Sequence, residues 1–338
     1  MILELLLMIV GLVLLVGGSD KFVESGSGIA KRLGVSDFII GLTLIAVGTS
    51  LPELASSIAA ALKGSSGLIV GNLVGSNIAN IGLIVGISAF IASIKTNETM
   101  LKRDGYIMLF VSIIFTLLTI RGVIDYIGGL VLLIVYFIHV LFLIETQAMI
   151  KQRFHFKEFV GYLLKFKFIG TLLNHSKRNS GKTPVSKKGL ANEFIISAMG
   201  LAALIYGAKL LIDNALYFSN MFGISETFIG LALIAIGTSL PELAVSLSAI
   251  KKGFNEILIG NIIGSNIVNI SLVFGISSLI RPVEIEFSSI YYLIPAMLVF
   301  SVLFLVFIRN EWKINRKQGA VLLVMYLLFL LFMGFKGV

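Results

Sequence analysis

The 338-residue chain contains no cysteine, so it can form neither a disulfide framework nor a thiolate metal site. Histidine is scarce as well. Its three copies, His139, His155 and His175, lie outside every repeated motif described below, which disfavours a zinc or haem centre. Charged residues make up only 13% of the chain, whereas a soluble globular protein is about 25% charged. These shortages argue against a disulfide-linked domain, a zinc enzyme and an ordinary soluble fold.

Apolar residues are abundant instead, at 57% of the chain. Apolar runs such as residues 1–16, 107–120 and 321–335, extended by their neighbours, approach the roughly 20 residues that a membrane-spanning helix needs. The first run has no basic segment before it and no small-residue cleavage site after it, so we interpret it as a retained helix and not as a signal peptide. The composition therefore predicts a polytopic membrane protein.

Two long strings occur twice in the chain. VSDFIIGLTLIAVGTSLPEL at residues 35–54 returns as ISETFIGLALIAIGTSLPEL at 224–243, and VGNLVGSNIANI at 70–81 returns as IGNIIGSNIVNI at 259–270. The same offset of 189 residues separates both pairs. A constant offset over two motifs indicates a whole repeated structural unit.

Apolar runs and polar breaks predict five helices in each copy. In the first copy they cover about residues 1–30, 37–62, 68–94, 104–120 and 124–146. In the second copy they cover about residues 191–220, 226–250, 257–280, 289–309 and 317–336. We therefore expect an all-α membrane protein of about ten transmembrane helices, arranged as two inverted five-helix repeats at 1–146 and 191–338, with a basic cytoplasmic linker at 147–190.

The basic residues indicate how these helices are oriented. An odd number of helices per copy forces the two copies into opposite orientations. If the linker is cytoplasmic, 21 of the 27 lysines and arginines fall on the cytoplasmic side and four on the other side, as positively charged inner loops require. Both termini are then extracellular, and the protein is a multi-pass component of the cell membrane. The formal charge of +9 is a sign of topology, and we expect no nucleic-acid partner.

The repeated string GTSLPEL places a proline and a glutamate inside an apolar helix. Because Pro52 and Pro241 lack an N–H group, each helix should kink or unwind just before its proline. Carbonyl groups freed at membrane depth must line a protein cavity or bind a ligand, since lipid offers them no partner. Thr49 and Ser50 lie four and three residues before Glu53, so we expect these three side chains on one helical face.

The two glutamates are costly to place in a membrane. A charged side chain at the bilayer centre costs at least about 2.5–3.5 kcal/mol, and it marks a functional site by default. A single copy is also explained by a glutamate bonded within the helix bundle. The occurrence of Glu53 and Glu242 at equivalent positions favours the functional interpretation. Inverted repeats of this kind are typical of secondary transporters, whose binding site lies near the membrane midplane.

The second motif adds hydroxyl and amide side chains at helical spacing: Ser76, Asn77 and Asn80 in the first copy, and Ser265, Asn266 and Asn269 in the second. One role for them is hydrogen bonding between helices. With the glutamates they form a set of oxygen donors, which hard cations such as Ca²⁺ and Na⁺ prefer; Ca²⁺ takes about 6–8 oxygens. Two carboxylates balance one divalent or two monovalent ions, so Ca²⁺ and Na⁺ can compete for one site.

At these residues the chain resembles the Ca²⁺/cation antiporter superfamily, specifically its sodium/calcium exchangers of prokaryotic type. The paired repeats of that family match GTSLPEL with GNLVGSN in the first half and GTSLPEL with GNIIGSN in the second. The resemblance implies a secondary antiporter that exchanges Ca²⁺ for Na⁺ by alternating access, without a cofactor. It also implies that the first helix of each repeat, 1–30 and 191–220, slides across a rigid body formed by the others.

The resemblance also implies roles for individual residues. Glu53 and Glu242 would ligate Ca²⁺ through their carboxylates, aided by the backbone carbonyls of Thr49 and Thr238. The following residues would contribute to Na⁺ sites or line the cavity: Ser50, Ser239, Ser76, Ser265, Asn80 and Asn269. Asn269 departs from archaeal members of the family, which often carry an aspartate there. The neutral pair Asn80 and Asn269 leaves two carboxylates in the site.

Three alternatives stay open on the sequence alone. An exchanger of H⁺ for Ca²⁺ or another divalent cation would use the same glutamates, because carboxylates also bind protons. A cation channel would need a continuous pore and several identical filter segments. An intramembrane enzyme could use Glu53 and Glu242 as a carboxylate dyad, but the chain has neither HExxH nor GxSxG, and we expect no enzymatic activity. The expected partners are the lipid bilayer, Ca²⁺ and Na⁺, with H⁺ as the open alternative; the sequence indicates no oligomeric state.

Overall fold

The computed structural model describes residues 2–32, 46–148, 156–168, 187–251 and 253–336. The first part of the predicted helix at 37–62 lies outside these residues. Most of the predicted linker at 147–190, including His155 and His175, also lies outside them.

The first half of the chain is helical over nearly all of its described length. Its helical segments are α1 (Ile2–Arg32), α3 (Ala46–Thr49), α4 (Leu51–Lys63), α5 (Ser66–Ala79), η2 (Asn80–Val85), α6 (Gly86–Ile91), η3 (Met100–Gly105), α7 (Tyr106–Thr119) and α8 (Tyr126–Ala148). A short helix, α9 (Phe156–Leu164), follows within the linker. The segments η2 and η3 are π-helical.

The second half repeats this order. Its helical segments are α11 (Lys187–Phe222), α12 (Glu226–Ile229), η4 (Gly230–Ile234), α13 (Ala235–Thr238), α14 (Leu240–Lys251), α15 (Asn255–Ile267), η5 (Val268–Val273), α16 (Phe274–Ile280), η6 (Ser289–Leu293), α17 (Ile294–Arg309), η7 (Asn310–Trp312) and α18 (Arg316–Lys336). Here η4, η5 and η6 are π-helical and η7 is a 3₁₀ turn.

The expected membrane-spanning character is found in most of these helices. Among the described residues, seven helices are long and apolar enough to cross a membrane, or eight if the bent pair Glu226–Thr238 and Leu240–Lys251 is one span. The fourth segment, Met100–Thr119, begins with three consecutive charged residues, 102–104. The number of ten spans therefore stays a prediction, whereas the helical membrane fold is confirmed.

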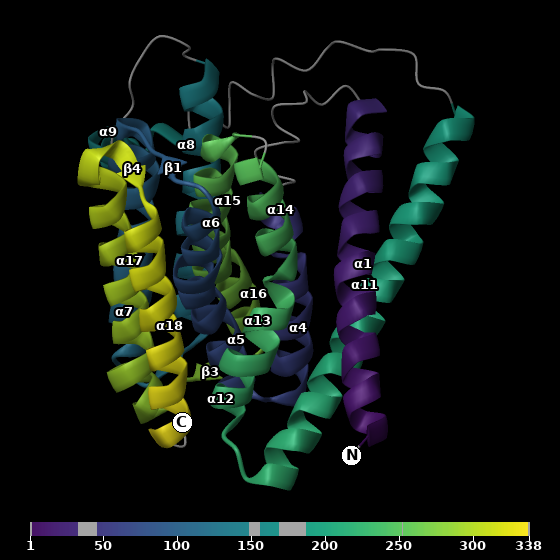
Figure 1. The fold of residues 1–338 in the computed structure, drawn as a ribbon. Coiled ribbons are helices and arrows are strands. Elements are labelled where there is room, and N and C mark those ends of the chain that lie inside the picture. Colours follow the sequence, from purple (N-terminus) through teal and green to yellow (C-terminus); the bar gives the residue numbers. More distant parts are fainter. Residues whose placement is uncertain (1, 33–45, 149–155, 169–186, 252, 337–338) are drawn as a thin grey trace.

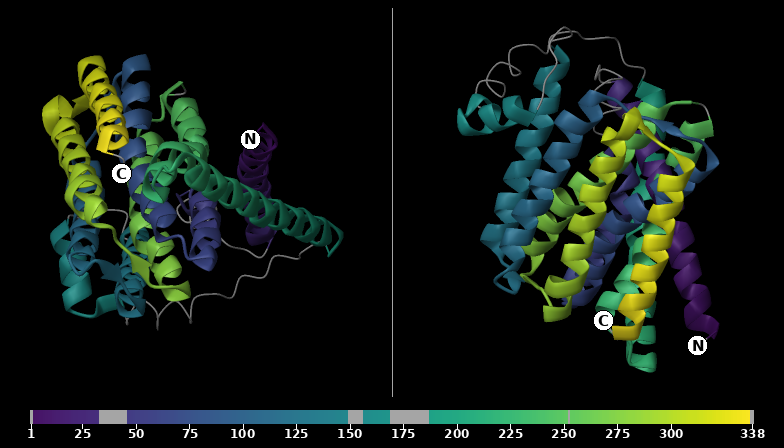
Figure 2. Two further views of the ribbon diagram at one scale, coloured as in Figure 1. Left: turned by 90° about the horizontal axis from the view of Figure 1, so that it is seen from below. Right: turned by 60° about the vertical axis from the view of Figure 1, so that its left-hand side comes forward.

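Two motif-bearing helices occupy the centre of the bundle (Figures 1 and 2). In the apolar helix Ser66–Ile91 94% of the most apolar window is buried, and in Asn255–Ile280 the share is 78%. Glycines let the first of them approach its neighbours. A Cβ atom on Gly71 would collide with the carbonyl oxygen of Thr227, and one on Gly75 would lie 3.0 Å from the Cβ of Ala235. The GxxxG pair thus brings α5 against α12 and α13 of the other half.

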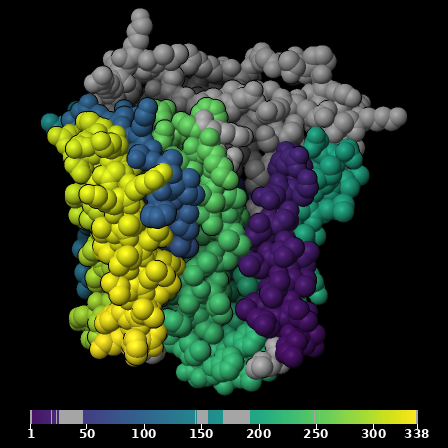
Figure 3. Space-filling view, in the orientation of Figure 1, coloured from purple at the N-terminus to yellow at the C-terminus, as the bar shows by residue number. Residues whose placement is uncertain are grey.

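Helices α1 and α11 form a separate antiparallel pair at one side of the molecule, opposite α17 and α18 (Figures 1 and 3). They cross at four glycines. A Cβ atom on Gly11 would lie 3.0 Å from the carbonyl oxygen of Gly207, and a Cβ atom on Gly18 would lie 2.8 Å from that of Gly200. Since Gly200 and Gly207 stand 189 residues after Gly11 and Gly18, each contact is the symmetry mate of the other.

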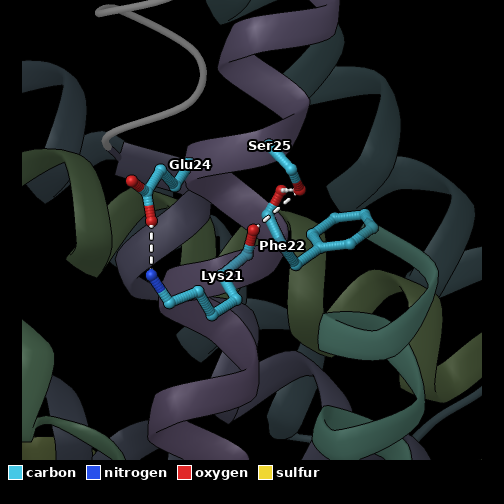
Figure 4. Close-up of polar contacts among 4 residues, drawn as sticks. All are labelled: Lys21, Phe22, Glu24 and Ser25. Carbon is cyan, nitrogen blue, oxygen red and sulfur yellow. Dashed lines mark hydrogen bonds and ion pairs between the residues drawn. The ribbon is translucent and has the colours of Figure 1, made fainter. Parts of the chain in front are cut away.

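The end of the apolar part of α1 is marked by charge. The apolar span covers Ile2–Phe22, and in its last turn Lys21 forms an exposed ion pair of 2.8 Å with Glu24 (Figure 4). The Ser25 hydroxyl next to it donates to the backbone carbonyls of Lys21 and Phe22, at 2.7 and 3.2 Å. The predicted helix at 1–30 includes Lys21, and the structure places Lys21 in the last turn of the apolar span.

Two short β-ladders were not expected in an all-α protein. The strand β1 (Ile94–Lys95) pairs antiparallel with β4 (Lys313–Ile314), and β2 (Val123–Ile124) pairs antiparallel with β3 (Val283–Glu284). Each ladder joins one half of the chain to the other. The first lies at the same end of the bundle as α9, whereas both chain termini and β3 lie at the opposite end (Figure 1).

The basic composition of the linker suggested a polar segment, but one part of it is buried. Helix α9 buries Phe159 and Tyr162, and the Phe159 ring packs edge-on against Phe142 at 5.3 Å and His139 at 6.3 Å between ring centroids. Helix α9 is therefore held against α8 by an aromatic cluster.

Candidate functional site

The two proline motifs interrupt their helices at a single residue each. Ser50, between α3 and α4, has φ −88° and ψ 7°, and Ser239, between α13 and α14, has φ −82° and ψ 7°. Pro52 and Pro241 each lie two positions into the helix that follows, where a missing N–H group costs no helical hydrogen bond. The breaks thus have the same geometry in both halves.

This break changes one expectation about the first motif. We expected Thr49, Ser50 and Glu53 to share one face of a helix. The helix is interrupted at Ser50, so these three residues do not belong to one continuous helix. The Ser50 hydroxyl donates across the molecule to Oε1 of Glu242, at 3.4 Å.

Glu53 and Glu242 lie in the first turns of α4 and α14, and both are fully buried, with 0% exposed. Oε1 of Glu53 accepts hydrogen bonds from Ser76 at 3.3 Å and from Ser239 at 3.2 Å. Each carboxylate therefore receives one hydroxyl from its own half and one from the other half. For Glu242 these donors are Ser265, at 3.2 Å, and Ser50.

The two carboxylates are linked through the serines at the helix breaks: Ser239, three residues before Glu242, donates to Glu53, and Ser50, three residues before Glu53, donates to Glu242. Two like charges in a water-excluded interior repel strongly unless something compensates them. The hydroxyl donors that bind each Oε1 are neutral. Compensation of the pair therefore requires a bound cation or protons.

Two asparagines that the sequence interpretation did not select hold the threonines of the motif. The Thr238 hydroxyl donates to Oδ1 of Asn72 at 3.2 Å, and that of Thr49 donates to Oδ1 of Asn261 at 3.3 Å. The Asn72 amide group donates in turn to Ser56 and Ser57, at 3.0 and 3.1 Å. The signal that could have found these asparagines is the dipeptide Gly-Asn that opens the second motif in both copies.

The remaining asparagines of the second motif bond with one another across the two halves. The Asn80 amide group donates to Oδ1 of Asn266 at 2.9 Å, and that of Asn269 donates to Oδ1 of Asn77 at 3.2 Å. Asn80 and Asn269 lie in the π-helical segments η2 and η5, and such segments are frequent at functional sites. Segment η2 contacts α14, which carries Glu242, and η5 contacts α4, which carries Glu53.

Four oxygen atoms of this cluster have no hydrogen-bond partner: Oε2 of Glu53, Oε2 of Glu242, Oδ1 of Asn80 and Oδ1 of Asn269. All four residues are 0% exposed. An unpaired buried acceptor costs about 1–3 kcal/mol, and more when it is charged. Because they are unpaired at two pairs of equivalent positions, these oxygens are candidate ligand atoms.

The cluster is closed to solvent and rich in oxygen. Every residue predicted to line the site is at most 9% exposed, a value reached by Thr49 alone. Within the described ranges no group of three or more histidine, cysteine, aspartate and glutamate residues is placed to hold a metal ion. The donor set of the cluster is therefore two carboxylates with hydroxyl and amide oxygens. Hard cations such as Ca²⁺ and Na⁺ match it.

Comparisons with known proteins agree with this chemistry. A family model described as sodium/calcium exchanger protein matches residues 3–145 and 192–335. The sodium/calcium exchanger MaX1 of Methanosarcina acetivorans is 42% identical over 338 residues, covering 96% of this chain and 97% of that protein. The inner membrane protein YrbG of Escherichia coli is 35% identical over 286 residues, covering 85% and 82%.

A solved structure is similar over nearly the whole chain. The sodium-calcium exchanger NCX_Mj, soaked with Na⁺, superposes with a TM-score of 0.61 at 30% sequence identity and covers 97% of both chains. The resemblance noted from the motifs is thereby confirmed.

Proposed function

The chain belongs to the sodium/calcium exchanger family and is a transporter, not an enzyme. On that premise, we propose that it exchanges Ca²⁺ for Na⁺ by alternating access. The observation that carries the proposal is the set of four unpaired, fully buried oxygens on Glu53, Glu242, Asn80 and Asn269. Cations bound among these residues would supply the partners that the four oxygens lack.

In this proposal Ca²⁺ binds between Glu53 and Glu242, whose two negative charges balance its own. The backbone carbonyls of Thr49 and Thr238 aid the glutamates in binding it, as the family resemblance implies. The residues that contribute to Na⁺ binding or line the cavity are Ser50, Ser239, Ser76, Ser265, Asn80 and Asn269. Four of these already surround the carboxylates as hydroxyl donors. A hydroxyl oxygen can turn from donating to a carboxylate to ligating a cation, because it has both a hydrogen and lone pairs.

Competition for the same carboxylates couples the two fluxes. One Ca²⁺ or two Na⁺ neutralise the glutamate pair, whereas the empty pair leaves two charges in a site closed to solvent. Changing the conformation with the site empty is therefore disfavoured, since a buried, uncompensated charge costs several kcal/mol. Exchange is favoured over a leak of either ion alone.

The architecture that we propose comprises ten spans in two inverted repeats, 1–146 and 191–338. The repeat numbering supports it: the contacts Ser50 to Glu242 and Ser239 to Glu53 are mates at the 189-residue offset. The family model supports the division as well, since it leaves residues 146–191 unmatched. With the basic linker in the cytoplasm, both termini lie outside the cell membrane, and they lie at one end of the bundle in Figure 1.

An exchanger of H⁺ for Ca²⁺ is the second candidate, and one observation favours it. Each glutamate has an oxygen without a hydrogen-bond donor, and two amide oxygens nearby are also unpaired. A protonated carboxyl group could donate to such an amide oxygen, so protons could replace Na⁺ as the counter-ion.

The decisive experiment measures ⁴⁵Ca²⁺ uptake into proteoliposomes that contain the purified full-length chain. We expect uptake to follow an outward Na⁺ gradient and to be absent when only a pH gradient is imposed. Uptake driven by the pH gradient without Na⁺ would support the H⁺ exchanger. Uptake that follows neither gradient, in protein that still binds Ca²⁺, would refute both forms of antiport.

A further inference from the structure

Behind the unpaired amide oxygens lies a second, fully enclosed layer of side chains. Asn77 and Asn266 are each 1% exposed, and Met108 and Met297 are 1% and 0% exposed. The methionines come from α7 and α17 and again stand 189 residues apart. This layer bonds to Asn80 and Asn269 but supplies none of the four unpaired oxygens of the site.

The hydrogen bonds of this layer fix which way each amide faces. The backbone carbonyl oxygen of Asn266 can only accept, so the atom of Asn77 that lies 3.1 Å from it must be the amide nitrogen. Oδ1 of Asn77 therefore faces the other way, where it accepts from the amide nitrogen of Asn269, at 3.2 Å. That bond uses the nitrogen of Asn269 and leaves its Oδ1 unpaired.

The mirror arrangement orients Asn80. The Asn266 amide nitrogen faces the backbone carbonyl of Asn77 at 3.5 Å and Sδ of Met108 at 3.7 Å. Oδ1 of Asn266 accepts from the Asn80 amide nitrogen at 2.9 Å, so Oδ1 of Asn80 is the atom left free.

The methionines reinforce this polarity. A thioether sulfur is a weak hydrogen-bond acceptor and cannot donate. It therefore favours the amide orientation in which the NH₂ group points toward the sulfur. Met108 contacts the amide nitrogen of Asn266, and Met297 lies 4.0 Å from that of Asn77. In each of these two asparagines, the amide nitrogen thus faces a backbone carbonyl oxygen and a thioether sulfur, both of which are acceptors.

We propose that Asn77 and Asn266 are positioning residues that set the polarity of the cation site: Asn77 turns the amide oxygen of Asn269 toward the ion, and Asn266 does so for Asn80. The inference rests on the proposed function. A primary amide can be turned over with little change in shape, and the reversed form would present an N–H₂ group where the cation binds. The second layer prevents that reversal without contacting the ion.

Asparagine-to-aspartate rescue tests the inference, because a carboxylate presents oxygen on both sides and has no wrong orientation. Equilibrium ⁴⁵Ca²⁺ binding to purified protein is measured for Asn77→Ala, for Asn269→Asp and for the double variant. We expect Asn77→Ala to weaken Ca²⁺ binding about tenfold, which corresponds to the net loss of one hydrogen bond to the ligand side chain. In the Asn269→Asp background the same Asn77→Ala change should cause no weakening.

The symmetry of the chain supplies a matched control. Asn80 is oriented by Asn266 and not by Asn77, so Asn77→Ala should still weaken binding about tenfold in the Asn80→Asp background. The mirror set, Asn266→Ala with Asn80→Asp and with Asn269→Asp, should give the reverse pattern. It also replaces the first set if Asn77→Ala is not recovered as folded protein, as judged by thermal unfolding.

Two outcomes would overturn the inference. Unchanged Ca²⁺ affinity in Asn77→Ala and Asn266→Ala would show that the second layer does not orient the ligands. The matched double variant combines Asn77→Ala with Asn269→Asp, and the crossed one combines Asn77→Ala with Asn80→Asp. Rescue of Ca²⁺ binding that is equal in these two variants, or absent from both, would show a general structural role. Neither outcome affects the proposed exchange, which stands or falls with Na⁺-dependent flux of the unaltered protein.

Discussion

The central helices and the α1–α11 pair are built in opposite ways, although both contain apolar sequence. In Ser66–Ile91 94% of the apolar window is buried, against 24% in Ile2–Phe22 and 33% in Asn192–Phe222. The two central helices each contain a π-helical segment, and the proline motifs beside them are broken at a serine. In contrast, α1 and α11 run for 31 and 36 residues without a break. The irregular backbone at the two proline motifs and in η2 and η5 is enclosed by protein, as the absence of water in a membrane requires.

The difference indicates a division of labour. The buried, interrupted helices hold the polar groups of the site, and their contacts cross between the two halves. The long continuous pair is packed chiefly against itself at four glycines. The family resemblance implies that this pair slides across the centre of the bundle.

The largest effect should come from removing a charge from the interrupted helices. We predict that Glu53→Gln and Glu242→Gln each reduce Ca²⁺ transport at least 100-fold, on the order of the 3 kcal/mol or more at stake when one partner of a buried charge pair is removed. The measurement is ⁴⁵Ca²⁺ flux in proteoliposomes. Glu24→Gln, the same change on the exposed face of α1, should leave transport unchanged. Substantial flux in either site variant would mean that the glutamates are structural.

The next effect concerns close packing of the centre. In Gly71→Ala the new methyl group meets the Thr227 carbonyl oxygen, a backbone atom that cannot move aside cheaply. We expect a loss of about 1–3 kcal/mol in stability, typical of overpacking, visible as a lower midpoint of thermal unfolding in detergent. Gly17→Ala in α1, where no atom lies within 4 Å, serves as the control and should not lower that midpoint. Equal effects would contradict the contrast between the two regions.

A smaller effect is expected from adding a charge to the site. Asn269→Asp supplies a third carboxylate beside the unpaired oxygens, so we expect the preference for Ca²⁺ over Na⁺ to change about tenfold, of the order of a single charge–ion interaction in a partly shielded site. Competition of Na⁺ against ⁴⁵Ca²⁺ binding measures it. Asn310→Asp, on an exposed turn, should have no effect. Identical competition curves for Asn269→Asp and the unaltered protein would place residue 269 outside the site.

The smallest effect should come from the ion pair that joins the two regions. Lys63 of α4 lies 2.9 Å from Asp213 of α11, and both side chains are at least one-third exposed. Exposed pairs contribute about 0–1 kcal/mol, so Lys63→Gln should shift thermal unfolding little. A shift as large as that of Gly71→Ala would show that α11 is fastened to the centre and would weaken the division proposed above.

The sequence was informative where the argument depended on composition and repetition. The apolar runs predicted most helices, and the offset of 189 residues identified two equivalent motifs. The structure brings these motifs together through the contacts of Ser50 with Glu242 and of Ser239 with Glu53. The proline motifs indicated a helix break, because a missing N–H group acts locally.

Features that depend on distant partners could not be read in this way. The sequence analysis did not select Asn72 and Asn261, and only their bonds to Thr238 and Thr49 connect them to the site. The π-helical segments at Asn80 and Asn269 and the two β-ladders depend on packing between halves. Helix α9 was hidden in a basic segment, because its buried face consists of only a few aromatic residues.

The central claim is that the two glutamates jointly hold one cation within the buried cluster. Equilibrium ⁴⁵Ca²⁺ binding to the purified chain, titrated with Na⁺, tests this claim most directly. We predict one Ca²⁺ bound per chain, displaced by Na⁺, and no binding in Glu53→Gln or in Glu242→Gln. Undiminished Ca²⁺ binding in either variant, or binding that Na⁺ cannot displace, would contradict the claim.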